Sequence, residues 1–222
     1  MSLIKLSYRL INSYSGMSIY LFLFLAFSAE SMSQSSYILN PVNSEMAILG
    51  TSSLHDWQME VKDINCSATM ITDGKNVRGI RDARFNCVTT SIVSDYKLMD
   101  KKTYEALKAD EFSSIDFKMT DGKVNSISAN EFSGIASGYL SIAGQKREVD
   151  IPFKGYLWME GQVKLEGKVV LKMSEFNIEP PTALLGSLKT GDEVSIVYSF
   201  LFENIDLKKS IAGSGAIDNT GN

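Results

Sequence analysis

The chain has 222 residues, of which 44% are hydrophobic and 22% are charged, with 4 prolines, 2 cysteines and 1 histidine. This length and apolar fraction suit one or two packed domains and exclude disulfide scaffolds, collagen-like repeats and wholly disordered chains. The formal net charge of −4, from 22 basic and 26 acidic residues, disfavours a protein that binds nucleic acid by neutralising its phosphates. One histidine and two cysteines are too few for a zinc site, and no pattern indicates a metal or redox cofactor.

The start of the chain has the pattern of an export signal. Lys5 and Arg9 lie in a segment without acidic residues, and residues 19–27 (IYLFLFLAF) form an apolar run. This run is about half as long as the roughly 18 apolar residues that span a bilayer. Small residues at 31–33 suit cleavage by a signal peptidase, with 26–29 as an earlier alternative.

We therefore predict a cleaved signal peptide over 1–33 and a periplasmic or secreted protein without a stable membrane anchor after cleavage. A short uncleaved anchor is the alternative, whereas the lack of a cysteine near the apolar run excludes a bacterial lipoprotein anchor. One domain over 34–205 and a Gly/Ser/Asn-rich, disordered tail over 206–222 complete the predicted organisation.

After residue 40 the dominant pattern is an alternation of apolar and polar residues, which indicates strands with one buried face. Gly-containing turns separate the alternating runs. Counting gives eight or nine antiparallel strands at meander spacing, which predicts a barrel or a sandwich. The runs lie at 64–70, 85–87, 115–119, 132–142, 146–158, 163–173 and 193–203.

Two segments depart from this alternation. Residues 100–108 (DKKTYEALK) favour a short helix that places Met99, Thr103 and Leu107 on one face, and we expect it to cap one end of the sheet. Residues 174–191 form a long loop, because two consecutive prolines exclude a helix or a central strand there. Long loops in compact domains are often functional.

The two cysteines, Cys66 and Cys87, lie on the apolar faces of two strands that flank the Asp73-Gly74 turn. We expect both thiols to face the interior, where a disulfide is allowed in a secreted protein. Two buried free thiols are the alternative.

Four stretches, in this order, resemble the YceI-like family of secreted lipid-binding proteins. Residues 50–57 (GTSSLHDW) are similar to the family's G-x-S-x-x-H-x-W strand, and 99–108 followed by 115–117 are similar to its helix and next strand. Residues 138–149 (GYLSIAGQKREV) are similar to its G-x-L-T-I-x-G-x-T-K-x-V, and 173–178 (MSEFNI) to its R-S-x-F-G-I. No single motif carries the resemblance, which rests on their order and spacing.

This resemblance implies an all-β fold: a lipocalin-like antiparallel barrel of about eight strands with one short helix, whose interior holds a long isoprenoid or other lipid chain. The chain departs from the family pattern in three places. Lys172-Met173 stands where the family has Arg before Ser174, Asn177 replaces a Gly, and the segment 180–186 differs from the commonest pattern.

The candidate residues for such a cavity are mostly inward-facing positions. Along 132–142 the inward series includes Gly134, Ala136 and Gly138 in succession, which leaves space unless neighbouring side chains fill it. A small barrel filled by its own side chains is the alternative. The ligand-binding candidates are His55, Trp57, Phe85, Leu107, Phe117, Phe132, Ala136, Phe153, Leu184 and Phe200.

Adjacent His55 and Asp56 raise the question of acid–base catalysis. Neighbours on a strand point to opposite faces, so Asp56 is not placed to orient the His55 ring, and we prefer a histidine hydrogen-bonded to backbone or to a ligand's polar head. The sequence thus predicts a non-enzymatic protein that binds, transports or stores a long apolar ligand, isoprenoid-like or fatty-acyl. The alternatives are a secreted interaction module with a filled core that binds a protein through 174–191, and a hydrolase that uses His55.

Overall fold

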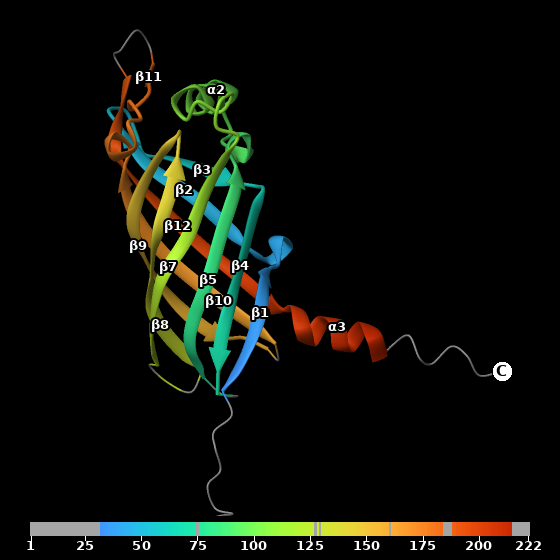
Figure 1. Ribbon diagram of the computed structural model, residues 1–222. Helices are drawn as coiled ribbons and strands as arrows, with labels where there is room; N and C mark the ends of the chain where they lie inside the picture. Colours follow the sequence, from blue (N-terminus) through green and yellow to red (C-terminus); the bar gives the residue numbers. More distant parts are fainter. Residues whose placement is uncertain are drawn as a thin grey trace, which may run out of the picture. The chain divides into compact units, whose positions relative to one another are not determined.

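The alternating runs form the wall of a closed antiparallel barrel (Figure 1). The structure, a computed structural model, describes residues 32–73, 76–126, 128, 130–159, 161–183 and 188–214. Five wall positions are single strands, and each of the other three is made of two shorter strands in succession. The barrel therefore has eight wall positions, as predicted from the sequence.

The single strands are β7 (Ser114–Ser126), β8 (Glu131–Ile142), β9 (Gln145–Leu157), β10 (Gln162–Lys172) and β12 (Leu188–Asn204). The divided positions are β1 (Ser33–Leu39) with β2 (Glu45–Ser52), β3 (Trp57–Val61) with β4 (Ile64–Thr72), and β5 (Val77–Val88) with β6 (Ile92–Val93). Neighbours along the chain are neighbours in the sheet, and β12 closes the barrel by pairing with both β2 and β1. This order is an up-and-down meander.

The break between β1 and β2 follows from the Asn40-Pro41 sequence. A short 3-10 turn, η1 (Pro41–Asn43), starts at Asn40, whose side-chain oxygen accepts hydrogen bonds from the backbone N–H groups of Val42 and Asn43. Proline has no N–H to donate to a ladder, which is why the strand is interrupted there. A second 3-10 turn, η2 (Thr89–Ser91), divides β5 from β6 without a proline or a side-chain cap.

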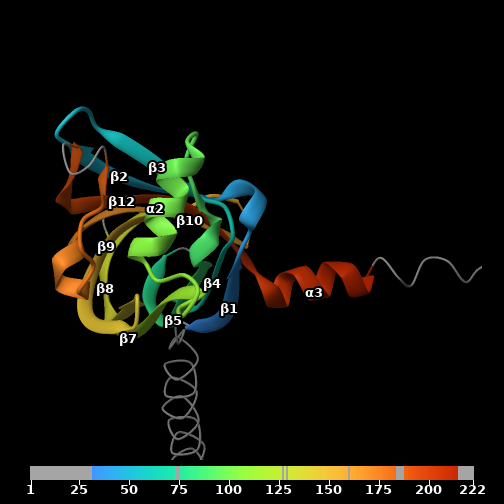
Figure 2. The same cartoon turned by 90° about the horizontal axis from the view of Figure 1, so that it is seen from above.

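Helix α2 (Lys97–Ala106) lies across one end of the barrel (Figure 2), as the sequence predicts. It begins at Lys97, three residues before the predicted start, so Asp100 lies in its first turn. The Asp100 carboxylate accepts hydrogen bonds from the Ser94 backbone N–H (2.7 Å) and hydroxyl (2.8 Å). On its barrel side, the Thr103 hydroxyl lies 3.3 Å from the Met59 sulfur and donates to it.

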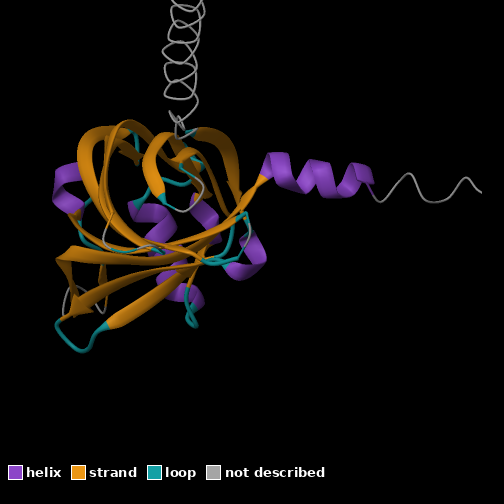
Figure 3. Ribbon diagram, turned by 90° about the horizontal axis from the view of Figure 1, so that it is seen from below, coloured by secondary structure: helices purple, strands orange, loops and turns teal. Residues whose placement is uncertain are grey.

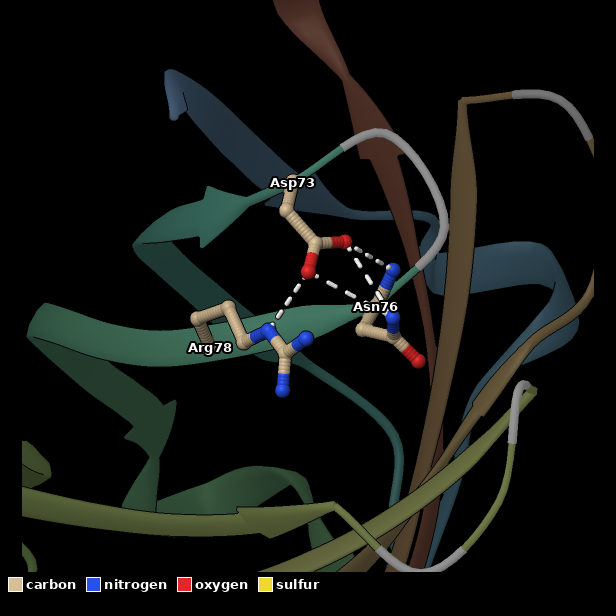
Figure 4. Close-up of polar contacts among 3 residues, drawn as sticks. All are labelled: Asp73, Asn76 and Arg78. Carbon is tan, nitrogen blue, oxygen red and sulfur yellow. Dashed lines mark hydrogen bonds and ion pairs between the residues drawn. The ribbon is translucent and has the colours of Figure 1, made fainter. Parts of the chain in front are cut away.

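At the opposite end, the β4–β5 connection is stabilised by the carboxylate of Asp73 (Figure 4). It accepts hydrogen bonds from the backbone N–H of Asn76 (2.9 Å) and from Nε of Arg78 (2.6 Å). Local side chain-to-backbone bonds of this kind are what make Asp and Asn good turn residues.

A second helix, α3 (Ile205–Ser214), follows β12 and extends away from the barrel wall (Figure 3). The Asn204 side-chain oxygen caps it by accepting from the N–H groups of Asp206 (2.9 Å) and Leu207 (3.1 Å). The Leu207 side chain lies against Gly161 in the β9–β10 connection. The sequence predicts disorder from residue 206, whereas a helix continues to Ser214; residues 215–222 lie outside the described part.

The predicted signal peptide falls almost wholly on residues 1–31, which lie outside the described residues. Within the barrel, Ser33 is the first residue of β1 and pairs with Thr72. Cleavage after residue 33 therefore removes one residue of β1 and leaves Gln34 paired with Ile71. Among the described helices, α2 and α3 included, none has the length and apolarity needed to cross a membrane.

The barrel end opposite α2 is closed by packed apolar side chains. Four of them, from four different strands, are at most 2% exposed: Met70, Val77, Phe132 and Val163. This packed layer closes the barrel at the end opposite α2.

Candidate functional site

A cavity of about 580 Å³ lies inside the barrel and opens at the α2 end. Its volume falls within the roughly 300–1,000 Å³ typical of small-molecule sites. The lining is almost entirely apolar and comes from α2 and from strands on all sides of the barrel. Met70, Val77, Phe132 and Val163 lie outside the lining, so the barrel is solid at one end and hollow at the other.

Most residues that the sequence nominates for the cavity are in its wall. Phe132 is not: it belongs to the closed end, where its ring packs edge-on against Phe153 with centroids 6.2 Å apart. Leu184 lies outside the described residues. The eight candidates that line the cavity are His55, Trp57, Phe85, Leu107, Phe117, Ala136, Phe153 and Phe200.

Aromatic rings form one side of the cavity. Phe200 on β12 stacks on Phe85 of β5, with centroids 6.1 Å apart, and lies 5.0 Å from Tyr198. The Tyr198 hydroxyl donates a hydrogen bond to the Pro152 carbonyl oxygen (3.0 Å), and burial raises the pKa of this phenol. Tyr198 therefore stays neutral and has its donor satisfied, which keeps this wall apolar.

The three small inward residues of β8 do not share one environment. Gly134 lies opposite Phe153 of β9, whose ring covers it, and Gly138 lies under the ring of Phe117 from β7. Only the middle residue, Ala136, is in the cavity lining. The sequence predicts space at these positions unless neighbouring side chains fill it, and at the two glycines neighbouring aromatic rings do fill it.

This arrangement recurs around the barrel. Cross-strand partners combine a glycine with an aromatic residue, and the ring folds over the glycine so that a Cβ there would overlap it. The pairs are Gly50 with Trp57, Gly134 with Phe153, Gly155 with Phe132, and Gly167 with Tyr198. These glycines accommodate ring packing rather than enlarge the cavity.

Both cysteines face the cavity as free thiols. Cys66 pairs in register with Phe85, and Cys87 pairs with Ile64, so the two cysteines are diagonal neighbours on adjacent strands. Diagonal residues are about 7–8 Å apart, beyond the Cα separation of about 4.4–6.8 Å that is usual for a disulfide. Burial raises the pKa of each thiol to about 12.

The polar part of the lining lies at the mouth. His55 is exposed there and donates its Nδ1 hydrogen to the carbonyl oxygen of Asp56 (2.7 Å), so its ring is satisfied by backbone, as expected. Lys102 of α2 and Lys172 at the end of β10 are also in the lining. Within the part of the chain that the structure describes, the lining contains no carboxylate.

Several lining residues escape the sequence analysis. Met46 and Ile48 of β2 line the cavity, but their strand reads EMAILGTS, in which Ala47 and Leu49 make both faces apolar and remove the alternation. Tyr96 and Leu98 line the mouth just before and within the first turn of α2. A predicted helix start at Lys97, with Tyr96 as its N-cap, would have included both residues.

The prediction of a continuous loop over 174–191 is wrong in part, because β12 already begins at Leu188; residues 184–187 lie outside the described part. The segment starts in the 3-10 turn η3 (Met173–Phe176), and a two-residue strand, β11 (Thr182–Ala183), pairs with the start of β12. The Asp192 carboxylate accepts hydrogen bonds from the Ser174 backbone N–H (2.8 Å) and hydroxyl (2.6 Å), and these bonds lower the Asp192 pKa.

Asn177, which replaces a glycine of the family pattern, has left-handed backbone angles (φ 54°, ψ 32°). Asparagine is the residue that tolerates this conformation best after glycine, so the departure preserves the turn.

No group of three or more histidine, cysteine, aspartate or glutamate side chains suited to a metal ion occurs in the described ranges. The histidine that was considered for catalysis lies at the mouth with its ring bonded to backbone. The site is therefore a hydrophobic cavity with a few polar side chains at its mouth.

A closed eight-stranded meander around an apolar cavity, covered at its open end by a helix, defines the class of lipocalin-like barrels. Residues 37–202 match the family model of the YceI-like domain, and the chain belongs to this family. No curated protein sequence matches the chain.

Solved structures show the same fold. The chain is 12% identical to a polyisoprenoid binding domain from Saccharophagus degradans implicated in plant cell wall breakdown, with a TM-score of 0.60, covering 77% of this chain and 99% of that one. It is 15% identical to Burkholderia cenocepacia BcnA, with a TM-score of 0.59, covering 73% and 98%. The Campylobacter jejuni YCEI protein is 15% identical, with a TM-score of 0.50, covering 65% and 82%.

Proposed function

We propose that this protein is a non-enzymatic carrier that holds a long apolar molecule, isoprenoid-like or fatty-acyl, inside the barrel. The observation that carries the proposal is the cavity of about 580 Å³ with its nearly unbroken apolar lining. An empty apolar space of this size costs stability, because the side chains around it lose packing partners. An apolar guest restores those contacts. The similar fold described as polyisoprenoid binding in Saccharophagus degradans supports the same class of guest.

The guest would lie with its tail toward Ala136 and Phe200 and its head at the mouth. The charged side chains of the lining are Lys102 and Lys172, and both are cationic. Lys102 contacts Glu105 at 3.1 Å, but Glu105 also lies 3.9 Å from Lys101 and would keep that partner if Lys102 turned toward a guest. A neutral or anionic head suits this mouth better than a cationic one.

Native mass spectrometry of the protein purified from its own source tests the proposal. The expected result is a mass above that of the chain, released as an apolar compound on extraction into organic solvent. A chain that is empty under gentle conditions, and that takes up no isoprenoid or fatty-acyl probe afterwards, contradicts it and favours a protein-interaction module.

We further propose that the chain is exported and works outside the cytoplasm, in the periplasm or beyond. The apolar run at 19–27 with basic residues before it and small residues after it supports this location. The mature protein should begin near Gln34. Intact-mass measurement on exported material that still shows the full 24.5 kDa chain would contradict cleavage at this position.

A further inference from the structure

Three exposed apolar side chains lie at the open end of the barrel, and we refer to Leu54, Tyr96 and Leu98 as the rim. Leu54 is in the β2–β3 turn and is 70% exposed. Tyr96 precedes α2 and is 70% exposed, and Leu98, in the first turn of α2, is 65% exposed. Tyr96 and Leu98 also line the cavity mouth, so the exposed apolar surface continues into the cavity. Exposed apolar patches beside a binding site commonly mark a surface that docks on something.

The charges beside Tyr96 and Leu98 are balanced. Between residues 95 and 105 the acidic residues are Asp95, Asp100 and Glu105, and the basic ones are Lys97, Lys101 and Lys102. Two of the acids are already engaged, Asp100 by Ser94 and Glu105 by the lysines beside it. A surface that carries both signs at once, such as a layer of zwitterionic phospholipid head groups, complements this pattern better than a surface of one sign.

The size of the rim also favours lipid over protein. An aromatic side chain buries roughly 150–250 Å² and a leucine less, so three side chains supply on the order of a few hundred Å². A stable protein interface buries about 800 Å² per partner. Leu54 comes from a turn and the other two from the start of α2, so the three side chains belong to separate elements.

We propose that the barrel docks on a phospholipid surface through Leu54, Tyr96 and Leu98, with the cavity mouth facing the lipid. This inference rests on the proposed function, because an apolar guest then passes between membrane and cavity without crossing water. The rim side chains enter the interfacial region of the bilayer, and the lysines and acids of α2 remain among the head groups.

The test compares two single substitutions, Leu54→Cys at the rim and Met159→Cys in the β9–β10 connection at the closed end. Met159 is 66% exposed and is therefore a matched control. Each variant of the full chain is labelled with a thiol-reactive dye that brightens in apolar surroundings. The two native thiols react slowly because burial raises their pKa to about 12.

On addition of phosphatidylcholine vesicles, the dye at position 54 should brighten several-fold and the dye at position 159 should not change. Because the charges beside Tyr96 and Leu98 are balanced, the response should persist in high salt. A response at both positions, at position 159 only, at neither, or one abolished by salt overturns the proposal. So does a dye at position 54 that is already bright without vesicles in a dimer, because a second copy then covers the rim.

A parallel measurement separates this inference from the proposed function. The variant Ala136→Phe, which fills the cavity, should dock like the unsubstituted chain while capturing no apolar guest. If the unsubstituted protein captures no guest but the dye at position 54 enters vesicles, the carrier function fails and docking stands. If a guest is captured and no dye enters vesicles, docking alone fails.

Discussion

The ring of Phe153 lies directly over Gly134, its partner on the neighbouring strand β8, and fills the space that a side chain at residue 134 would occupy. Two residues further along the same strand, Ala136 faces the open cavity. Two successive inward positions of one strand thus differ in the free volume beside them: a ring fills it at Gly134, and it stays open at Ala136. Along β8, free space remains at the inward residue that no aromatic ring from a neighbouring strand covers.

The variant Gly134→Ala should therefore destabilise the protein although it adds a single methyl group. The new Cβ would overlap the Phe153 ring and the Lys123 carbonyl oxygen, and backbone cannot give way cheaply. Overpacking of this kind costs about 1–3 kcal/mol. Denaturant unfolding measures the change in free energy, and an unchanged transition midpoint would show that the ring does not cover Gly134.

Cys66 and Cys87 should resist alkylation in the native protein. Cys87 is buried, Cys66 is half-buried, and each thiol lines the cavity with a pKa of about 12, so at pH 8 thiolate is on the order of a thousandfold scarcer than in a free cysteine. The labelling rate should rise about tenfold per pH unit, and unfolded protein should label at once. Peptide mass analysis that finds either thiol rapidly labelled in folded protein would mean that the strand register is wrong by one residue.

Stability should decrease in acid partly through Glu203. Its carboxylate accepts hydrogen bonds from Lys208 of α3 (2.9 Å) and from the Asn40 side chain (2.7 Å), and these lower its pKa below 4.5. A lowered native pKa contributes stability that is present above the unfolded value and is lost as the pH falls through the native value. The variant Glu203→Gln should cost less than about 1 kcal/mol at pH 7.

The comparison for this variant is made in thermal unfolding from pH 7 to pH 3. The two melting curves should differ at neutral pH and converge as the pH falls through the lowered native pKa of Glu203, where the native carboxylate of the unsubstituted protein becomes protonated as well. A difference that is constant across this range would exclude ionisation of Glu203 as its source.

The fold follows from local patterns, whereas the cavity follows from contacts between strands. Alternation within runs such as 163–173 identifies the wall strands, and the helical face of Thr103 and Leu107 identifies the cap. Local sequence does not tell that Phe117 covers Gly138, because that contact depends on the pairing of β7 with β8.

Two differences between the sequence predictions and the structure have local causes that alternation and composition do not show. The apolar outer face of β2 hides the inward positions Met46 and Ile48. Near the end of the chain, the Gly/Ser/Asn content of the tail predicts disorder, but the Asn204 cap and the contact of Leu207 with Gly161 start a helix first. Composition describes a whole segment, whereas the start of a helix depends on whether the backbone N–H groups of its first turn find hydrogen-bond acceptors.

The carrier account is tested most directly by Ala136→Phe, measured for unfolding and for capture of an apolar probe in ligand-free protein, with Gly134→Ala as the matched control. A phenyl group at residue 136 enters the cavity, so the free energy of unfolding should change by less than about 1 kcal/mol while capture is lost. The much smaller Gly134→Ala change should destabilise more. If Ala136→Phe instead lowers stability by about 1–3 kcal/mol or more, or leaves capture intact, the interior at Ala136 is packed or unused and the account is contradicted.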